Sequence, residues 1–251
     1  LKNAMGVGIP GTGMIGLPIA IALGALVGKS EYQLEVLKDS NPAAVDEGKR
    51  FIAEKRINIS LKENISEKLY IEVCCESGEN KATAIIAGGH TTFIYIARNG
   101  GILFSRQNAS SEETKEQTVD LTLRKVYDFA MDAPLDEIRF ILETARLNKA
   151  AAESSFDKNY GHGLGRMLRG TYEHKILGDS VFSHILSYTS GACDARMAGA
   201  MIPVMSNSGS GNQGISATLP VLVYAEENGK SEEELIRALM LSHLPVIYIK
   251  Q

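Results

Sequence analysis

The 251-residue sequence contains no tryptophan and only three cysteines, and aromatic residues make up 6% of it. Three cysteines are too few, and odd in number, for the disulfide framework of a small secreted protein. The first residues do not read as a secretory signal peptide. We therefore expect a cytoplasmic protein.

The sequence also lacks a block of basic residues. It has 26 Lys and Arg against 30 Asp and Glu, a formal net charge of −4. Without a basic patch we expect no binding to nucleic acid or to an anionic membrane surface. The longest apolar stretch, residues 14–27, is interrupted by Pro18 and by glycines and is shorter than the roughly 20 residues of a membrane-spanning helix. It predicts a buried helix instead.

Both ends of the sequence read as the interior of a larger fold. The chain begins with Leu1 and soon reaches a Gly-rich apolar motif, and Gln251 directly follows the apolar residues 244–249. Natural termini are usually polar and frayed. We therefore expect an internal fragment, with further functional groups outside it.

Local patterns predict helices on both sides of a small sheet. Asn41 and Pro42 are typical of the N-cap and first residue of a helix. Asn99-Gly100 is typical of a type I′ turn between two antiparallel strands. Alternating apolar residues predict strands over residues 69–75, 82–87, 92–97 and 101–105.

Beyond the strands the apolar spacing becomes helical. Thr114 with Gln117 forms a capping-box pattern, and Pro134 is placed to start a second helix. The predicted fold class is therefore α+β, a predominantly helical domain with a small antiparallel β-sheet insertion. The predicted parts are a first part of the helical core at residues 1–55, the insertion at 56–110 and a second part of the core at 111–251.

The first glycine loop, Gly11-Thr12-Gly13-Met14-Ile15-Gly16, matches the GxGxxG pattern of dinucleotide-binding proteins. The match alone is a weak signal. The strands that follow read as antiparallel hairpins, whereas a Rossmann fold needs alternating parallel strands and helices. A Rossmann-type NAD(P)-dependent oxidoreductase is therefore kept only as an alternative.

The same pattern recurs in the second glycine loop at residues 209–214. Each copy precedes an apolar, proline-containing helix that ends in Gly-Lys-Ser-Glu, at residues 28–31 and 229–232. We hypothesise two related loop–helix units whose helix N-termini face one site and attract a carboxylate or phosphate. The alternative is that the glycines only allow helices to pack closely.

The segment Ser206–Gly214 carries three hydroxyl and three amide side chains between two apolar stretches. Such uncharged donors and acceptors suit a small zwitterion or its carboxylate. Upstream, Arg196 is placed to clamp a carboxylate with Asp194 orienting it, or the two form a structural ion pair.

The sequence predicts no complete metal site. Cys74 and Cys75 are neighbours on a predicted strand and so point to opposite faces. None of the five histidines has an Asp or Cys partner at ligand spacing. Helical histidines such as His184 and His243 are usually hydrogen-bonded packing residues.

The segments Gly8–Gly16, Asp194–Arg196 and Ser206–Gly214 carry a family resemblance. The sequence resembles, over essentially its whole length, the bacterial and archaeal L-cysteine desulfidase family, which is related to the alpha chain of iron-sulfur L-serine dehydratase. The resemblance implies a lyase that splits L-cysteine into pyruvate, ammonia and sulfide, or L-serine into pyruvate and ammonia. It also implies a 4Fe-4S cluster acting as a Lewis acid on the leaving group, while a protein base removes the α-proton.

The family carries its cluster cysteines in a Gly-Cys-Thr motif near the N-terminus and in two motifs nearer the C-terminus. None of these motifs occurs in this sequence. The resemblance therefore implies cluster ligands outside residues 1–251 and a fragment that is inactive alone. The alternative is a non-catalytic relative that only binds an amino acid. Whether the substrate is L-cysteine or L-serine stays open.

We assign the small amino-acid substrate to the second glycine loop. The assigned binding residues are Ser206, Asn207, Ser208, Ser210, Asn212 and Gln213, with Gly11, Thr12 and Gly13 as the facing wall and Arg196 and Asp194 at the carboxylate end. His184 is a candidate base only because it lies near them in sequence. Close-packed small residues are also compatible with a homodimer.

Overall fold

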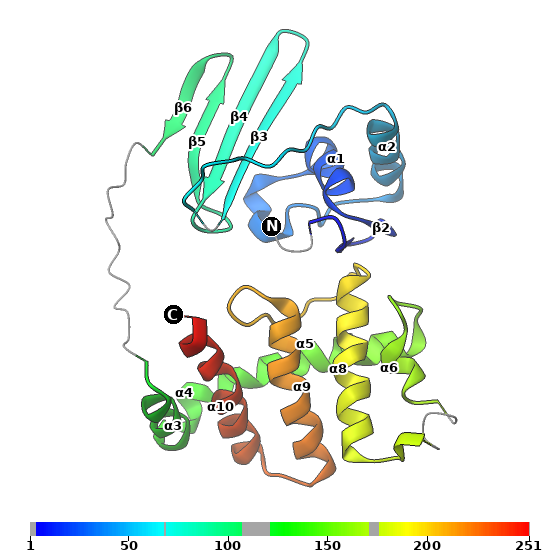
Figure 1. Ribbon diagram of the computed structural model, residues 1–251, viewed down its shortest axis with the longest axis vertical. Coiled ribbons are helices and arrows are strands. Elements are labelled where there is room, and N and C mark those ends of the chain that lie inside the picture. The colour runs from blue at the N-terminus through cyan, green and yellow to red at the C-terminus, as the bar shows by residue number, and fades with distance from the viewer. Residues whose placement is uncertain (1–3, 68, 107–120, 171–175, 251) are drawn as a thin grey trace. The chain divides into compact units, whose positions relative to one another are not determined.

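The computed structural model describes residues 4–67, 69–106, 121–170 and 176–250. The chain forms two compact units, drawn in Figure 1. The first consists of Leu1–Ala4 and Leu17–Val119, and the second of Met5–Gly16 and Asp120–Gln251. The chain therefore passes from the first unit to the second and back before residue 17.

Two helices of the first unit pack against each other. They are α1 (Leu17–Val27) and α2 (Pro42–Ala53), joined through the 3₁₀ helix η1 (Ser30–Glu35). The Asn41 side chain accepts a hydrogen bond from the backbone N–H of Ala44 at 3.0 Å, which confirms the predicted N-cap. Gly48 of α2 lies against Ile19 of α1, and the missing side chain allows this close contact.

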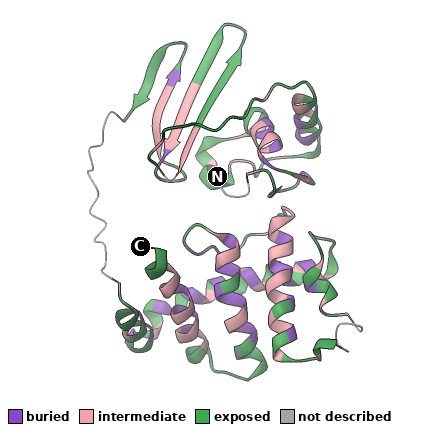
Figure 2. Ribbon diagram, in the orientation of Figure 1, coloured by how far each residue is buried: buried purple, intermediate pink, exposed green. Residues whose placement is uncertain are grey.

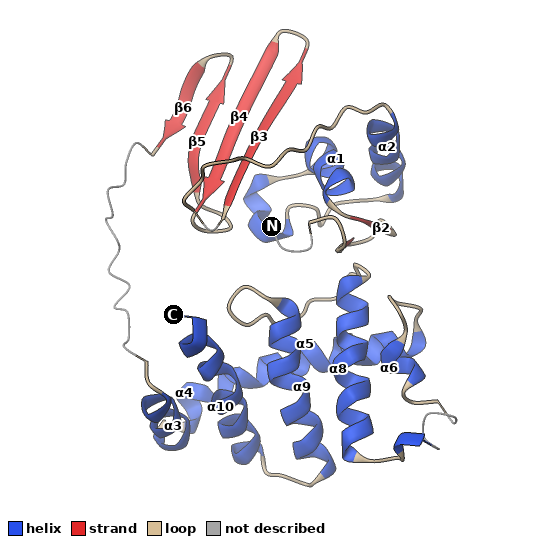
Figure 3. Ribbon diagram, in the orientation of Figure 1, coloured by secondary structure: helices blue, strands red, loops and turns tan. Residues whose placement is uncertain are grey.

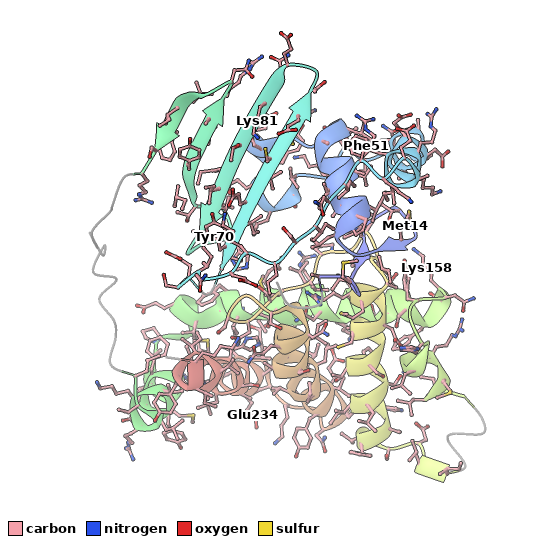
Figure 4. The ribbon with its side chains drawn as sticks, turned by 45° about the horizontal axis from the view of Figure 1, so that its top comes forward. Met14, Phe51, Tyr70, Lys81, Lys158 and Glu234 are labelled. Carbon is pink, nitrogen blue, oxygen red and sulfur yellow. The ribbon has the colours of Figure 1, made fainter. Side chains whose placement is uncertain are left out.

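The sheet of the first unit is an antiparallel meander. Its strands are β3 (Tyr70–Ser77), β4 (Asn80–Ala87), β5 (Phe93–Arg98) and β6 (Gly101–Ser105), in that order. Asn99 and Gly100 have φ values of 48° and 80°, as a type I′ turn requires, so the predicted hairpin is confirmed. Tyr70 and Lys81 mark opposite ends of the β3–β4 hairpin (Figure 4).

The second unit is helical apart from the short antiparallel hairpin of β1 (Gly8–Ile9) and β2 (Met14–Ile15). Its described helices are α3 (Leu123–Asp132), α4 (Leu135–Ile138), the 3₁₀ helix η2 (Arg139–Ile141), α5 (Leu142–Asp157), α6 (Leu164–Met167), α8 (Val181–Met197), α9 (Gly211–Glu227) and α10 (Glu232–Lys250). Pro134 precedes α4 as predicted. The predicted capping box at Thr114 and Gln117 lies outside the described residues.

The core of the second unit lies between α5, α8, α9 and α10, where Figure 2 shows the buried positions. Ile215, Leu219, Ile236 and Leu239 are fully buried there. Small residues also allow close packing in this unit, because a Cβ at Gly165 would collide with the backbone of α8.

The predicted fold class is confirmed. Helices predominate in Figure 3, and both described sheets are small and antiparallel. The units do not coincide with the predicted segments 1–55, 56–110 and 111–251, because α1 and α2 belong to the same unit as the sheet. Among the described helices, none combines the length and apolar character needed to cross a membrane.

Candidate functional site

The second glycine loop folds into a tight turn in front of α9. The backbone N–H of Asn207 donates to the carbonyl of Ser210, and the N–H of Ser210 donates to the carbonyl of Asn207, both at 3.0 Å. Ser208 and Gly209, between them, have φ values of 47° and 74°. Both values lie in the left-handed region that a type I′ turn needs. The turn ends at Ser210, the N-cap of α9.

The N-terminus of α9 keeps two backbone donors free. Ser210 accepts from the N–H of Gln213 through its side chain and from the N–H of Gly214 through its carbonyl. Within the described residues, the N–H groups of Gly211 and Asn212 have no recorded acceptor. Free N–H groups and the helix dipole together make this end of α9 partially positive.

The guanidinium of Arg196 lies at this same helix end. Arg196 is in the last turn of α8, and a Cβ at Gly211 would collide with its Nε. Its Nη1 donates to Oδ1 of Asn212 at 3.1 Å. No carboxylate pairs with Arg196 in the part of the chain that the structure describes. A half-buried cation with only neutral partners beside a positive helix end gives this region a positive electrostatic potential.

Asp194 does not orient Arg196. Its carboxylate accepts hydrogen bonds from the backbone N–H groups of His162, at 3.2 Å, and Gly165, at 3.4 Å. Side chains two positions apart on a helix do not face each other, which separates Asp194 from Arg196. The expected ion pair between Asp194 and Arg196 does not form, and Asp194 does not orient Arg196 either. Asp194 instead stabilises the turn before α6.

Asn207 faces the interior of the second unit. Its Nδ2 lies 3.0 Å from the carbonyl oxygen and 3.0 Å from Nδ1 of His243 on α10. Its Oδ1 accepts from the hydroxyl of Ser208 at 2.8 Å. Both of these side chains are therefore engaged within the protein, whereas Asn212 and Gln213 lie on the first turn of α9.

The first glycine loop has a different structure from the second. Its Gly11 and Gly13 lie at the tip of the β1–β2 hairpin, with φ values of 74° and 63°. The Thr12 hydroxyl donates to the carbonyl of Ile9 at 2.7 Å and accepts from the N–H of Met14 at 2.9 Å. The first motif therefore forms a hairpin whose last glycine, Gly16, directly precedes α1, whereas Gly211 and Gly214 of the second motif lie inside α9, so the two loops differ in local structure.

Both glycine loops nevertheless contact the same part of the second unit. A Cβ at Gly8 of the hairpin would collide with the backbone of Ala198 and Gly199, directly after α8. Gly11 lies near the side chain of Met201. Because Arg196 touches α9 just before this segment, the hairpin and the α9 N-terminus flank one end of α8.

His184 lies at the other end of α8. Its Nδ1 is 2.7 Å from Glu227 and its Nε2 is 2.6 Å from Asp179, and these carboxylates raise its pKa above the ordinary value. Arg196 lies twelve positions after His184 on α8, which corresponds to about 18 Å along the axis. The two side chains cannot contact the same small amino acid, so we assign His184 no catalytic role.

The cysteines do not fit an iron-sulfur cluster. Cys74 and Cys75 are exposed on β3 of the first unit, and Cys193 lies on α8 of the second. Burial raises the pKa of the Cys193 thiol, which disfavours the thiolate that metals bind. Within the described ranges, no three His, Cys, Asp or Glu side chains gather as a metal site.

Sequence reasoning missed two polar side chains behind the turn, Asn148 and Thr218, and gave a third, His243, only a general packing role. Asn148, Thr218 and His243 are buried and hydrogen-bonded to one another or to the turn. The sequence feature that could have identified them is their position inside otherwise apolar helices. A polar residue at a core position needs a hydrogen-bond partner.

The sequence of the chain is similar to those of known proteins. A family model described as the serine dehydratase alpha chain matches residues 31–251. The chain is 80% identical over its full length to a UPF0597 protein of Bacteroides fragilis (strain ATCC 25285) and covers 59% of that protein. It is 51% identical over its full length to a UPF0597 protein of Porphyromonas gingivalis and 45% identical over 99% of its length to one of Vibrio campbellii, and it again covers 59% of each.

No solved structure shows significant similarity to the chain. The chain spans 59% of the length of these curated relatives. The family model covers most of the chain, and the relatives match nearly all of it. The chain therefore belongs to the serine dehydratase alpha chain family.

Proposed function

We propose that the full-length protein is a β-eliminating lyase for a small L-amino acid, and that this chain binds the substrate's α-carboxylate. The observation that carries the proposal is the Arg196 guanidinium at the N-terminus of α9, where the described residues provide no carboxylate partner. Membership of the serine dehydratase alpha chain family supports the reaction class.

The charges at this site favour an anionic ligand. Arg196 and the two free N–H groups of Gly211 and Asn212 all carry positive or partially positive hydrogens. Their mutual repulsion is relieved when an anion binds between them. A carboxylate has two oxygens, so one accepts from the guanidinium and the other from the backbone N–H groups.

The whole substrate is a small zwitterion, so beyond its carboxylate it carries a positively charged α-ammonium group and a short side chain. Gln213 has no recorded hydrogen bond through its side chain within the described residues, so its amide is available to the α-amino group or the side chain of the substrate. Asn212 holds the guanidinium in place through its Oδ1. We assign the ligand-facing role to Arg196, Gly211, Asn212 and Gln213, and a supporting role to Asn207 and Ser210.

Iron-sulfur dependence is part of the proposal for the full-length protein. The three cysteines of this chain do not fit a cluster, so its ligands would come from outside residues 1–251. When bound, a cluster supplies a Lewis acid for the leaving hydroxyl or thiolate. The role of this chain's residues is to hold the carboxylate end of the amino acid. A cytoplasmic location and a homodimer are further proposals.

The test uses the full-length protein, purified without oxygen and reconstituted with iron and sulfide. Pyruvate release from L-serine, or pyruvate and sulfide release from L-cysteine, supports the lyase and identifies the substrate. Binding without turnover would favour a non-catalytic amino-acid-binding relative. Absence of both binding and turnover contradicts the proposal.

Asn212→Ala is the variant that tests the site. It removes the hydrogen bond that positions Arg196, and we expect the amino-acid KM to rise at least tenfold, equivalent to about 1.4 kcal/mol. Asn228→Ala is the matched control, because Asn228 caps the opposite end of the same helix. An unchanged KM in Asn212→Ala removes this helix end from the substrate site.

A further inference from the structure

Four polar side chains from separate parts of the sequence meet in the interior of the second unit. They are Asn148 of α5, Asn207 of the turn, Thr218 of α9 and His243 of α10, with exposed fractions of 0%, 5%, 0% and 7%. Such a network stabilises a fold only when every member finds a partner of the right kind. The hydrogen positions can therefore be worked out one by one.

The hydroxyl of Thr218 determines whether Nε2 of the His243 ring carries a hydrogen. Its Oγ1 lies 2.7 Å from the carbonyl oxygen of Gly214, and two oxygens at this distance need a hydrogen between them. The single hydroxyl hydrogen of Thr218 is therefore used. His243 Nε2 lies 3.0 Å from the same Oγ1 and must itself donate, so Nε2 carries a hydrogen.

The side-chain amide of Asn207 determines whether Nδ1 of the His243 ring carries a hydrogen. The carbonyl of His243 can only accept, so the Asn207 atom 3.0 Å away is the amide nitrogen. This orientation also leaves Oδ1 to accept from the Ser208 hydroxyl. The second hydrogen of the same amide nitrogen points to His243 Nδ1 at 3.0 Å, so Nδ1 is an acceptor without a hydrogen.

The network thus requires a neutral imidazole with its hydrogen on Nε2. Burial lowers the pKa of His243, in agreement with this form. The ring's two partners, Asn207 and Thr218, are both uncharged. A charged side chain also contacts the turn itself, because Nζ of Lys250 donates to the carbonyl of Ser208 at 3.1 Å.

His243 joins the turn to the body of α9. Through Nδ1 and its carbonyl it holds Asn207, the first residue of the turn, and through Nε2 it holds Thr218, two helical turns into α9. The turn ends at Ser210, and the free N–H groups of the anion site follow directly. The distance between these two anchors sets where the N-terminus of α9 begins.

We propose that His243, as the neutral Nε2–H tautomer, is the positioning residue that sets the conformation of the 207–210 turn and so the placement of the substrate-binding end of α9. The link to substrate rests on the function proposed above. The link to the turn does not, because it concerns hydrogen bonds that exist without a ligand.

Two variants separate the two ring hydrogen bonds. Asn at position 243 places an amide near the former Nδ1, so His243→Asn keeps an acceptor for Asn207 and loses the contact to Thr218. Gln reaches the former Nε2, so His243→Gln keeps a donor for Thr218 and loses the acceptor for Asn207. Each variant removes one hydrogen bond. His243→Asn, which should keep the turn intact, also leaves the larger cavity, so a pure cavity effect would act against the expected result.

The first readout needs no ligand. The backbone N–H of Ser210 closes the turn by donating to Asn207, so its hydrogen exchange reports the turn. Relative to the amide of Ala151 in α5, we expect at least tenfold faster exchange in His243→Gln and less than a threefold change in His243→Asn. Equal effects in both variants, or no change in His243→Gln, overturn the proposal.

The second readout uses the full-length protein with L-serine and L-cysteine. We expect a KM at least tenfold higher in His243→Gln with kcat little changed, and rescue to within threefold in His243→Asn. If the wild-type protein binds neither amino acid, the proposed function fails, and the exchange result still decides the role of His243.

A third measurement needs no variant and covers the case in which one of them does not fold. Nitrogen chemical shifts of the His243 ring in the wild-type protein distinguish the two neutral tautomers from the imidazolium. The Nε2–H tautomer near neutral pH is expected. An Nδ1–H tautomer or a charged ring overturns the proposal.

Discussion

Arg196, at the end of α8, lies against Gly211, the first residue of α9, so closely that any side chain at position 211 would displace the guanidinium. This contact brings a cation to the positive end of a 17-residue helix. The arrangement is electrostatically unfavourable for the empty protein and favourable for a bound anion. Glycine at position 211 is therefore explained by the position of Arg196.

Gly211→Ala should impair binding without unfolding the protein. Gly211 does not have a positive φ, and alanine is well tolerated in the first turn of a helix, so we expect the free energy of unfolding to change by less than about 1 kcal/mol. The displaced Arg196 should lower amino-acid affinity at least tenfold, measured by titration calorimetry with L-serine.

Gly214→Ala serves as the contrast. A Cβ there would collide with the carbonyl oxygen of Met205 and the backbone of Ser206, which cannot swing aside as an arginine end can. We expect a loss of about 1–3 kcal/mol in unfolding free energy. Unchanged affinity in Gly211→Ala would mean that Arg196 does not contact the ligand.

His184 should stabilise the protein most at acid pH. Glu227 and Asp179 raise its pKa above the ordinary value of about 6.5, so the folded protein binds this proton more tightly than the unfolded chain does. The stabilisation is complete below the unfolded-state pKa and is lost as pH rises through the higher folded-state pKa.

The measurement is urea unfolding of wild type and His184→Gln at about pH 5.5 and about pH 8.5. The difference in unfolding free energy between the two proteins should be larger at the lower pH. His90→Gln, at an exposed turn of the first unit, is the control. A difference that grows with pH would show that the carboxylates do not hold a protonated imidazole.

Arg237 should contribute more to stability than an exposed arginine. Its Nη1 donates to the carbonyl oxygens of Ala130, at 3.0 Å, and Ala133, at 3.4 Å, which joins α10 to the end of α3. Arg237→Met keeps the apolar stem and leaves these carbonyls without the charged donor. We expect a loss of about 1.5–3 kcal/mol in unfolding free energy.

Arg139→Met is the control for Arg237→Met. Arg139 pairs with Glu232 at 2.6 Å, but both side chains are more than half exposed. Exposed ion pairs are screened by water and salt, so a small loss is expected. Similar losses in the two variants would contradict a structural role for the Arg237 hydrogen bonds to α3.

The thiols should differ in reactivity. Cys74 and Cys75 are exposed on β3, whereas Cys193 is partly buried and burial raises its pKa. Since the thiolate is the reactive form, a thiol reagent should label Cys74 and Cys75 quickly and Cys193 slowly in the native protein. Mass spectrometry of peptides locates the labels, and denatured protein, where all three react, is the control. Rapid labelling of Cys193 would contradict its burial.

The fold elements that could be predicted depend on neighbouring residues. The Asn41 cap and the Asn99-Gly100 turn each require only the conformational preferences of two or three adjacent residues. The α+β class followed from the same local patterns. The extent of the two units could not be predicted, because it depends on which helices pack together.

The sequence by itself determined the local elements, and it showed that the second glycine loop is a polar segment at which a helix begins. It did not distinguish the two GxGxxG segments, because glycine accepts both the hairpin conformation at Gly13 and the helical one at Gly211. Tertiary structure decided that Arg196 meets Gly211 and that His243 meets Asn207, 36 residues away. Contacts over such separations come from helix packing, which no local pattern encodes.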